Sequence, residues 1–226
     1  MPQHPAASTV RAVVFDVGET VIDETTEYGT WADWLGVPRH TFSAMFGAVI
    51  AQGEDYRQTF QHFRSGFDLA IERLQRERAA APEDFDERDL YPDARPCLTR
   101  LKELGFLVGL AGNQTARAER LLRQLDLPAD FIGTSDGWGV EKPSPAFFAK
   151  IIAECGCPPG EIAYVGDRLD NDINPALAAG MVTVFLRRGP WGYIHADHPD
   201  AAKAHLQVDS LADLPQLLQA LRPPST

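Results

Sequence analysis

The segment VVFDVGET, residues 13–20, restricts the fold of this chain more than any other stretch. Residues 12–15 form an apolar run that ends abruptly at Asp16, and Gly18 follows two positions later. Such a run predicts a strand that is buried on both faces, as strands are in parallel sheets. An acid at its end is costly to desolvate unless it meets a cation or hydrogen-bond donors. We therefore expect a parallel sheet with Asp16 at the carboxyl edge, where open α/β sheets bind ligands.

The bulk composition narrows the class of protein. The 226 residues are 44% hydrophobic, which suffices for one core domain with an inserted subdomain. No apolar run approaches the roughly 18 residues that cross a bilayer, and residues 1–9 lack the features of a secretory signal. We expect residues 1–9 to be a disordered lead-in and the protein to be cytoplasmic. The net charge of −11 argues against nucleic acid or a membrane surface as partner.

The chain divides by pattern into a helical stretch and an α/β stretch. In residues 24–89 the apolar positions recur at helical spacing. Three apolar runs carry this signal: Trp31, Trp34 and Leu35; Phe42, Met45, Phe46, Val49 and Ile50; Phe60, Phe63, Phe67, Ile71 and Leu74. The third run predicts one continuous stripe, and the charged residues within 72–78 predict a solvated face. We interpret the aromatic residues as the core of a helical bundle rather than as the lining of a substrate pocket.

From residue 90 onward, helical and strand patterns alternate. Helices are predicted over 92–104, 116–125, 145–154, 172–179 and 211–221, and strands over 106–111, 131–134, 162–165, 182–186 and 206–208. This alternation predicts an α/β fold with a doubly wound parallel sheet. We expect one α/β core domain built from residues 1–22 and 90–226, with a helical domain over 23–89 inserted into it.

Residues that carry or permit ligand chemistry end several of these strands or precede a helix: Asp16, Gly112, Asn113, Lys142, Asp167 and Asp172. If the sheet is wound as predicted, they share one edge. Several acids at one place repel one another unless a cation lies between them, and oxygen ligands of this kind suit Mg²⁺. Lys142 offers a compact positive charge for an anionic substrate. The pattern therefore predicts a magnesium site next to an anion site.

Three motifs in this order resemble those of the haloacid dehalogenase (HAD) superfamily of hydrolases: FDVGET at 15–20, KPSP at 142–145 and VGDRLDND at 165–172. The order and spacing fit over nearly the whole chain, and the helical insert resembles the family's cap between its first and second motifs. The resemblance implies a HAD-like Rossmannoid core, hydrolase activity and Mg²⁺ as cofactor. It makes a magnesium-dependent phosphatase acting on a small phosphorylated metabolite the first hypothesis.

The resemblance also implies a role for each matching residue. Asp16 would be the nucleophile that forms an aspartyl-phosphate, and Lys142 would neutralise the nucleophile and the transferred phosphoryl group. Mg²⁺ would be held by Asp16, the carbonyl of Gly18 and Asp167, and Asp172 would bind it through water or orient its bound waters. Thr20 would brace the first loop through its hydroxyl, and Asp170 is expected to have only a local structural role.

Two positions depart from the family's pattern. Gly18 stands where phosphatases of the family usually carry an aspartate that acts as general acid and base. The loss of such a group typically lowers the rate about 10²- to 10⁴-fold, and Glu19 is expected to point elsewhere. Gly112 stands where a serine or threonine usually holds the phosphoryl oxygen. We expect backbone N–H groups and the Asn113 amide to take over that contact.

These departures leave two other hypotheses open. One is a catalytically weakened or non-enzymatic member that binds a phosphorylated ligand or a protein partner. The other is a 2-haloacid dehalogenase, which Gly18 permits but which the acids of residues 167–172 disfavour because they would repel a carboxylate substrate. Arg57, His62 and Arg64 are possible anion contacts in the cap, and residues 187–191 are expected to form a loop. No motif identifies the substrate or an oligomeric state.

Overall fold

The computed structural model describes residues 10–220, which divide into two compact units. Residues 23–89 form a helical unit, and the described residues on both sides of it form an α/β unit. Their assignment as cap and core domains stays a prediction. The predictions for residues 1–9 and for a helix end at Leu221 lie outside the described residues.

The α/β unit contains one six-stranded sheet, in the order β3-β2-β1-β4-β5-β6, in which every neighbouring pair is parallel. The strands are β1 (Ala12–Phe15), β2 (Leu107–Gly112), β3 (Phe131–Thr134), β4 (Ile162–Gly166), β5 (Val182–Leu186) and β6 (Leu206–Val208). The predicted α/β fold with a parallel sheet is therefore confirmed.

The register of the central strands positions the carboxyl edge. In β1, Phe15 pairs with Leu110 of β2 on one side and with Val165 of β4 on the other. All four residues of β1 are buried, as expected for a strand covered on both faces. The segments that follow β1, β2 and β4 therefore begin side by side at one edge of the sheet.

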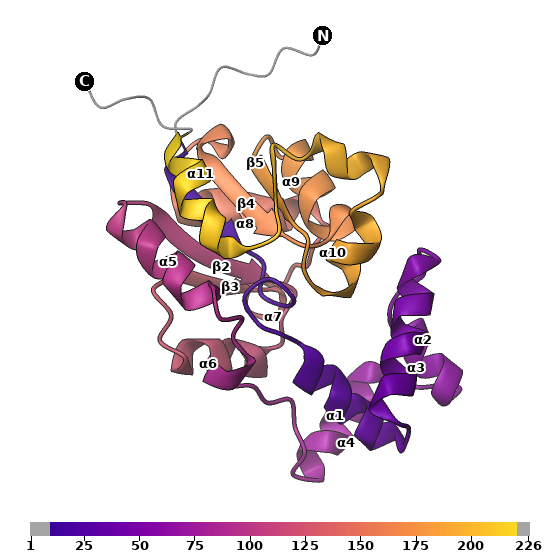
Figure 1. Ribbon diagram of the computed structural model, residues 1–226. Coiled ribbons are helices and arrows are strands. Elements are labelled where there is room, and N and C mark those ends of the chain that lie inside the picture. The colour runs from indigo at the N-terminus through magenta and orange to yellow at the C-terminus, as the bar shows by residue number, and fades with distance from the viewer. Residues whose placement is uncertain (1–9, 221–226) are drawn as a thin grey trace, which may run out of the picture. The chain divides into compact units, whose positions relative to one another are not determined.

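Helices connect the strands of this unit (Figure 1). They are α5 (Ala94–Glu103), α6 (Ala116–Gln124), α7 (Ser135–Trp138), α8 (Pro145–Cys155), α9 (Asn174–Ala178), α10 (Gly189–His195) and α11 (Leu214–Ala220). On one face of the sheet, Phe147 and Phe148 of α8 pack into a cluster with Val14 and Tyr164. Burying an aromatic or aliphatic side chain of this size contributes about 1.5–3 kcal/mol.

Two predicted segments of the α/β unit differ from the structure. The helix predicted over 172–179 begins earlier, as a π-helical turn (η3, Leu169–Ile173), and continues as α9. Within this turn, Oδ2 of Asp172 accepts a hydrogen bond from the backbone N–H of Arg168. Of the loop predicted over 187–191, residues 189–191 are instead the start of α10, whose Pro190 suits a first helical turn and whose Trp191 is buried.

The helical unit contains α1 (Thr25–Leu35), α2 (Arg39–Ala51), α3 (Gln58–Phe63) and α4 (Leu69–Arg78). The prediction of one stripe from Phe60 to Leu74 is wrong, because the chain breaks between α3 and α4. Gly66 has a φ of +75°, and Asp68 begins a new helix by accepting hydrogen bonds from the N–H groups of residues 70 and 71. As a result Ile71 and Leu74 remain 53% and 55% exposed.

The prediction of a solvated charged face on α4 is also wrong for two residues. Glu72 and Arg76 are buried. Arg76 donates to the carbonyl of Ala81, and its guanidinium lies 4.1 Å from the ring centre of Trp31. Trp31 packs edge-on against Phe60 inside the unit, so these aromatic side chains belong to its core. Within residues 10–220, no helix combines the length and the apolar character needed to cross a membrane.

Candidate active site

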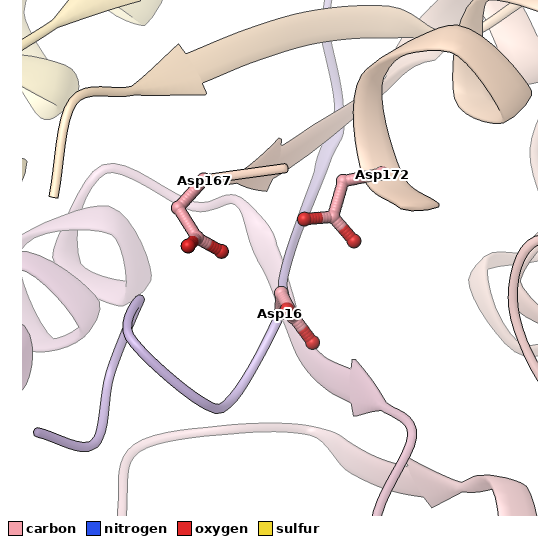
Figure 2. A group of neighbouring side chains, drawn as sticks. All are labelled: Asp16, Asp167 and Asp172. Atoms are coloured by element: carbon pink, nitrogen blue, oxygen red, sulfur yellow. The ribbon is translucent and has the colours of Figure 1, made fainter. Parts of the chain in front are cut away.

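Three buried carboxylates meet at the carboxyl edge of the sheet (Figure 2). Asp16 follows β1, Asp167 follows β4, and Asp172 lies in the π-helical turn just beyond. One oxygen atom from each lies within 4.8 Å of the others. The sequence separates Asp16 from Asp167 by 151 positions, so it is the parallel pairing of β1 with β4 that brings them together.

Lys142 is the cation of this cluster. Its Nζ lies 2.7 Å from Oδ1 of Asp16 and 2.6 Å from Oδ1 of Asp172, and its side chain is 1% exposed. Burial opposes the positive charge, but Asp16 and Asp172 outweigh this effect and raise the pKa of Lys142 well above its usual value. Lys142 therefore carries a full charge and neutralises one of the two acids that it contacts.

Asn113 fixes the backbone of Lys142. Its Oδ1 accepts from the Lys142 N–H at 2.7 Å, and its Nδ2 donates to the Lys142 carbonyl at 3.0 Å. This pair of hydrogen bonds holds the segment before α8 against the end of β2. The side-chain amide of Asn113 thus positions Lys142, and the direct substrate contact expected from the sequence stays a prediction.

Asp167 lacks the compensation that the other two acids receive. It is 1% exposed, and its Oδ2 has no hydrogen-bond partner among the described residues. Burial, followed by the charges of Asp172 and Asp16, raises the pKa of Asp167 well above its usual value. Burial also raises the pKa of Asp172 to about 6, although Lys142 opposes the shift. An unpartnered buried carboxylate oxygen beside two further acids fits a hard divalent cation such as Mg²⁺.

Gly112 gives Asp16 the room to pair with Lys142. A Cβ atom at position 112 would lie 2.5 Å from Oδ1 of Asp16. A serine or threonine there would therefore require the Asp16 carboxylate to move. Gly18 lies in the loop that follows Asp16 and has no side chain, so position 18 supplies no acid to the site.

The neighbours of Gly18 differ partly from expectation. The prediction that the Thr20 hydroxyl braces the loop is wrong, since Oγ1 of Thr20 is buried without a hydrogen-bond partner among the described residues. Glu19 is buried and has a φ of +53°, and its Oε2 accepts a hydrogen bond of 2.5 Å from the hydroxyl of Tyr91. Asp170 pairs with Arg168 at 2.6 Å, in line with its expected local role.

Sequence reasoning missed two aromatic residues of this region. Tyr164 interrupts the apolar run of β4, and its hydroxyl donates to the carbonyl of Ala111 beneath Lys142. A polar ring in the middle of a buried strand was a usable signal. Tyr91 follows the helical unit and carries no comparable signal, because its contact with Glu19 joins residues 72 positions apart.

The possible anion contacts of the helical unit have partners within that unit. Arg57 pairs with Asp55 at 2.9 Å, and Arg64 pairs with the buried Glu72 at 3.1 Å. These ion pairs account for the charge of both arginines. A role for Arg57, His62 or Arg64 in substrate binding stays a prediction.

A family model of haloacid dehalogenase-like hydrolases matches residues 10–180 of this chain. A glyceraldehyde 3-phosphate phosphatase of Pyrococcus furiosus is 28% identical over 94% of this chain and 93% of its own length. The protein of the same name from Methanopyrus kandleri is 44% identical over 105 residues, but the match covers only 45% of each chain. A phosphoglycolate phosphatase of Aliivibrio fischeri is 26% identical over 83% of this chain and 87% of its own.

Solved structures show the same fold. A putative HAD-hydrolase of Bacillus subtilis bound to magnesium, YfnB, is 17% identical and gives a TM-score of 0.69 over 93% of this chain and 99% of its own. A dehalogenase with an intermediate complex is 22% identical and gives 0.65 over 92% and 97%. The fold is thus shared with a HAD-hydrolase and with a dehalogenase. The match of the family model over residues 10–180 means that this chain belongs to the haloacid dehalogenase-like hydrolases.

Proposed function

We propose that this protein is a magnesium-dependent phosphatase that acts on a small phosphorylated metabolite through an aspartyl-phosphate on Asp16. The observation that carries the proposal is the buried group of Asp16, Asp167 and Asp172 with Lys142 in contact with Asp16. The names of the relatives, glyceraldehyde 3-phosphate phosphatase and phosphoglycolate phosphatase, support a short phosphorylated substrate. A cytoplasmic location remains part of this proposal.

The metal would be held by Asp16, the carbonyl of Gly18 and Asp167, with Asp172 beside it. When bound, Mg²⁺ would supply positive charge that lets an anionic phosphoryl group approach a carboxylate. The unpartnered Oδ2 of Asp167 is the observation that favours a cation at this point. Lys142 contacts Asp16 and would stabilise the charge that develops on the phosphoryl oxygens.

The reaction takes place in two steps. A carboxylate oxygen of Asp16 attacks phosphorus, and the bond between phosphorus and the ester oxygen breaks. The leaving oxygen takes a proton from water, because Gly18 offers no acid at the usual position. Water then attacks the aspartyl-phosphate, releasing inorganic phosphate and a proton and restoring the Asp16 carboxylate.

The two glycines favour a second candidate function. With no acid at residue 18 and no side-chain donor at residue 112, the same fold could bind a phosphorylated ligand and turn it over slowly or not at all. The 2-haloacid dehalogenase alternative is less well supported, since Asp167 and Asp172 would repel a carboxylate substrate. Chloride release from a 2-haloacid in the presence of a chelator would favour the dehalogenase instead.

A screen of phosphorylated metabolites with and without Mg²⁺ tests the proposal. We expect Mg²⁺-dependent phosphate release that Asp16→Asn abolishes and that Asp209→Asn leaves unchanged, because the Asp209 side chain is 69% exposed and pairs only with Arg187 among the contacts described. Ligand-induced stabilisation without turnover across the screen would favour the binding protein over the phosphatase.

A further inference from the structure

The segment that follows β5 contacts the loop that carries Asp16. Nη1 of Arg188 donates a hydrogen bond of 2.9 Å to the carbonyl of Thr20, and the Arg188 side chain is only 10% exposed. Next to it, Gly189 has a φ of +62°, and a Cβ there would lie 2.6 Å from both Cβ and Oε2 of Glu19. Arg188 therefore contacts Thr20 through a hydrogen bond, and Gly189 approaches Glu19 closely because it has no side chain.

Arg188 is itself held by Tyr91 and Asp93, in the segment that leads into α5. Its Nη2 lies 2.5 Å from Oδ2 of Asp93, which also accepts hydrogen bonds from Ser210 Oγ at 2.7 Å and from the N–H of Leu211 at 2.9 Å. The guanidinium lies 4.1 Å from the ring centre of Tyr91. The planar fork of arginine makes these contacts at the same time, which a lysine could not do.

Tyr91 extends the same contacts to Glu19. Its ring lies under Arg188, and its hydroxyl donates to Oε2 of Glu19. Glu19 has a left-handed backbone conformation that residues other than glycine rarely adopt. Such a conformation persists where the surroundings fix it. Here Tyr91, Gly189 and a 2.7 Å hydrogen bond from the Glu19 N–H to the Ile22 carbonyl do so.

We propose that Arg188, together with Tyr91, is a positioning residue that fixes the loop of residues 16–20 for metal binding and phosphoryl transfer. This inference rests on the proposed function, because the loop holds Asp16 and Gly18, two of the proposed metal ligands. A loop fixed before the ligand arrives loses less freedom on binding and keeps the nucleophile in line. Arg188 touches neither substrate nor metal in this account and acts only through residues 19 and 20.

Four variants test this role: Arg188→Met, Arg188→Lys, Tyr91→Phe and, as matched control, Arg187→Met. Arg187 is the neighbouring arginine, but it pairs with Asp209 and its side chain is 47% exposed. For each variant we would measure the Kd for Mg²⁺ by calorimetry on metal-free protein, far below its melting temperature. The kcat and KM for an aryl phosphate and the melting temperature complete the set.

We expect Arg188→Met to weaken Mg²⁺ binding by about 10- to 100-fold, as the loss of other residues that orient metal ligands does. It should also lower kcat more than it raises KM. Arg188→Lys should restore part of the Mg²⁺ affinity, since it can still reach one of the two acceptors. Tyr91→Phe removes a single hydroxyl and should shift both quantities in the same direction by a smaller factor. Arg187→Met should match the wild type.

A purely structural role gives a different result. If Arg188→Met and Tyr91→Phe lower only the melting temperature, while the folded proteins bind Mg²⁺ as the wild type does, the inference is overturned. If the wild type binds Mg²⁺ but hydrolyses no phosphate ester, the proposed function fails, and the Mg²⁺ affinities still decide the role of Arg188. A wild type that does not bind Mg²⁺ overturns both.

Discussion

Asp167→Asn should stabilise the metal-free protein and remove its response to Mg²⁺. The variant keeps the shape of the side chain but deletes the charge of Asp167, the one acid in the cluster with a fully buried oxygen that lacks a hydrogen-bond partner among the described residues. Asp16 and Asp172 each contact Lys142, whereas the structure gives Asp167 no ion pair among those residues. Removing the charge at position 167 therefore removes repulsion without breaking an ion pair.

The size of the effect follows from the geometry. Two unit charges 4.8 Å apart repel each other by about 3.5 kcal/mol at an effective dielectric constant of about 20. Asp167 faces two such neighbours but can escape by binding a proton, which at about pH 7.5 costs a carboxyl of ordinary pKa about 5 kcal/mol. That cost is an upper limit. The amide of the new asparagine is also buried, and its unmade hydrogen bonds offset part of this gain. We therefore expect the free energy of unfolding to rise by about 2–4 kcal/mol, which corresponds to about 5–15 °C in melting temperature.

Thermal unfolding with EDTA and with excess Mg²⁺ measures both parts of this prediction. Wild-type protein should melt at a higher temperature with Mg²⁺, because a ligand that binds only the folded state stabilises it. Asp167→Asn should melt at a higher temperature than wild type in EDTA and should gain little from Mg²⁺. Asp209→Asn, the same change on the exposed surface, should behave as wild type. The reasoning is refuted if Asp167→Asn melts at or below wild type in EDTA, or gains as much from Mg²⁺.

Three further predictions follow from the same cluster. Affinity for Mg²⁺ should fall as the pH is lowered from about 7 to about 5, because burial raises the pKa of Asp172 to about 6 and protons then compete with the metal. Equal Kd values for Mg²⁺, measured by calorimetry at both pH values, would contradict this prediction. Gly112→Ala should lower kcat by about 10²-fold, because its Cβ displaces the Asp16 carboxylate, and an unchanged kcat would show that this carboxylate moves freely. Gly18→Asp should raise the hydrolysis rate of alkyl phosphates about tenfold or more relative to that of aryl phosphates, because an aryl oxide leaves without protonation by an acid. An unchanged ratio of the alkyl to the aryl rate would rule out the missing acid as the cause of slow alkyl phosphate hydrolysis.

The convergence of the acids could be predicted because it depends on local patterns and one topological rule. The apolar run before Asp16 and the run before Asp167 each predict a buried strand, and parallel strands end at the same edge. The place of Lys142 before a helix predicts a positive charge for an anionic substrate, and the resemblance assigns Lys142 a role beside the nucleophile. What fixes it, the pair of hydrogen bonds with Asn113, depends on the exact approach of two segments 29 positions apart.

The remaining errors share a physical cause. Helical spacing from Phe60 to Leu74 favoured one helix, but Gly66 and the cap at Asp68 determine where the chain turns. Glu72 and Arg76 look like surface residues in the sequence, yet their partners come from elsewhere in the unit, and buried pairing outweighs their usual preference for water. The periodicity of apolar residues predicts one helix or strand at a time and gives no information on contacts between elements.

The charges of the cluster determine which kind of cation it can hold. When all are ionised, three carboxylates and one ammonium group carry a net charge of −2, so one divalent cation neutralises the cluster and one monovalent cation does not. Burial, the largest cause, and neighbouring acids raise the pKa of Asp167 and Asp172, so protons compete with a cation for these two carboxylates. A phosphoryl group brings further negative charge to a site that is then only neutral. In the proposed phosphatase reaction, its binding would depend on backbone N–H groups at the strand ends and on Lys142, whose charge would shift from Asp16 to the phosphoryl oxygens as the bond to phosphorus forms. On this reasoning Lys142→Met should lower kcat more than Lys142→Arg does, because arginine keeps the positive charge although its larger guanidinium fits the Lys142 position less well.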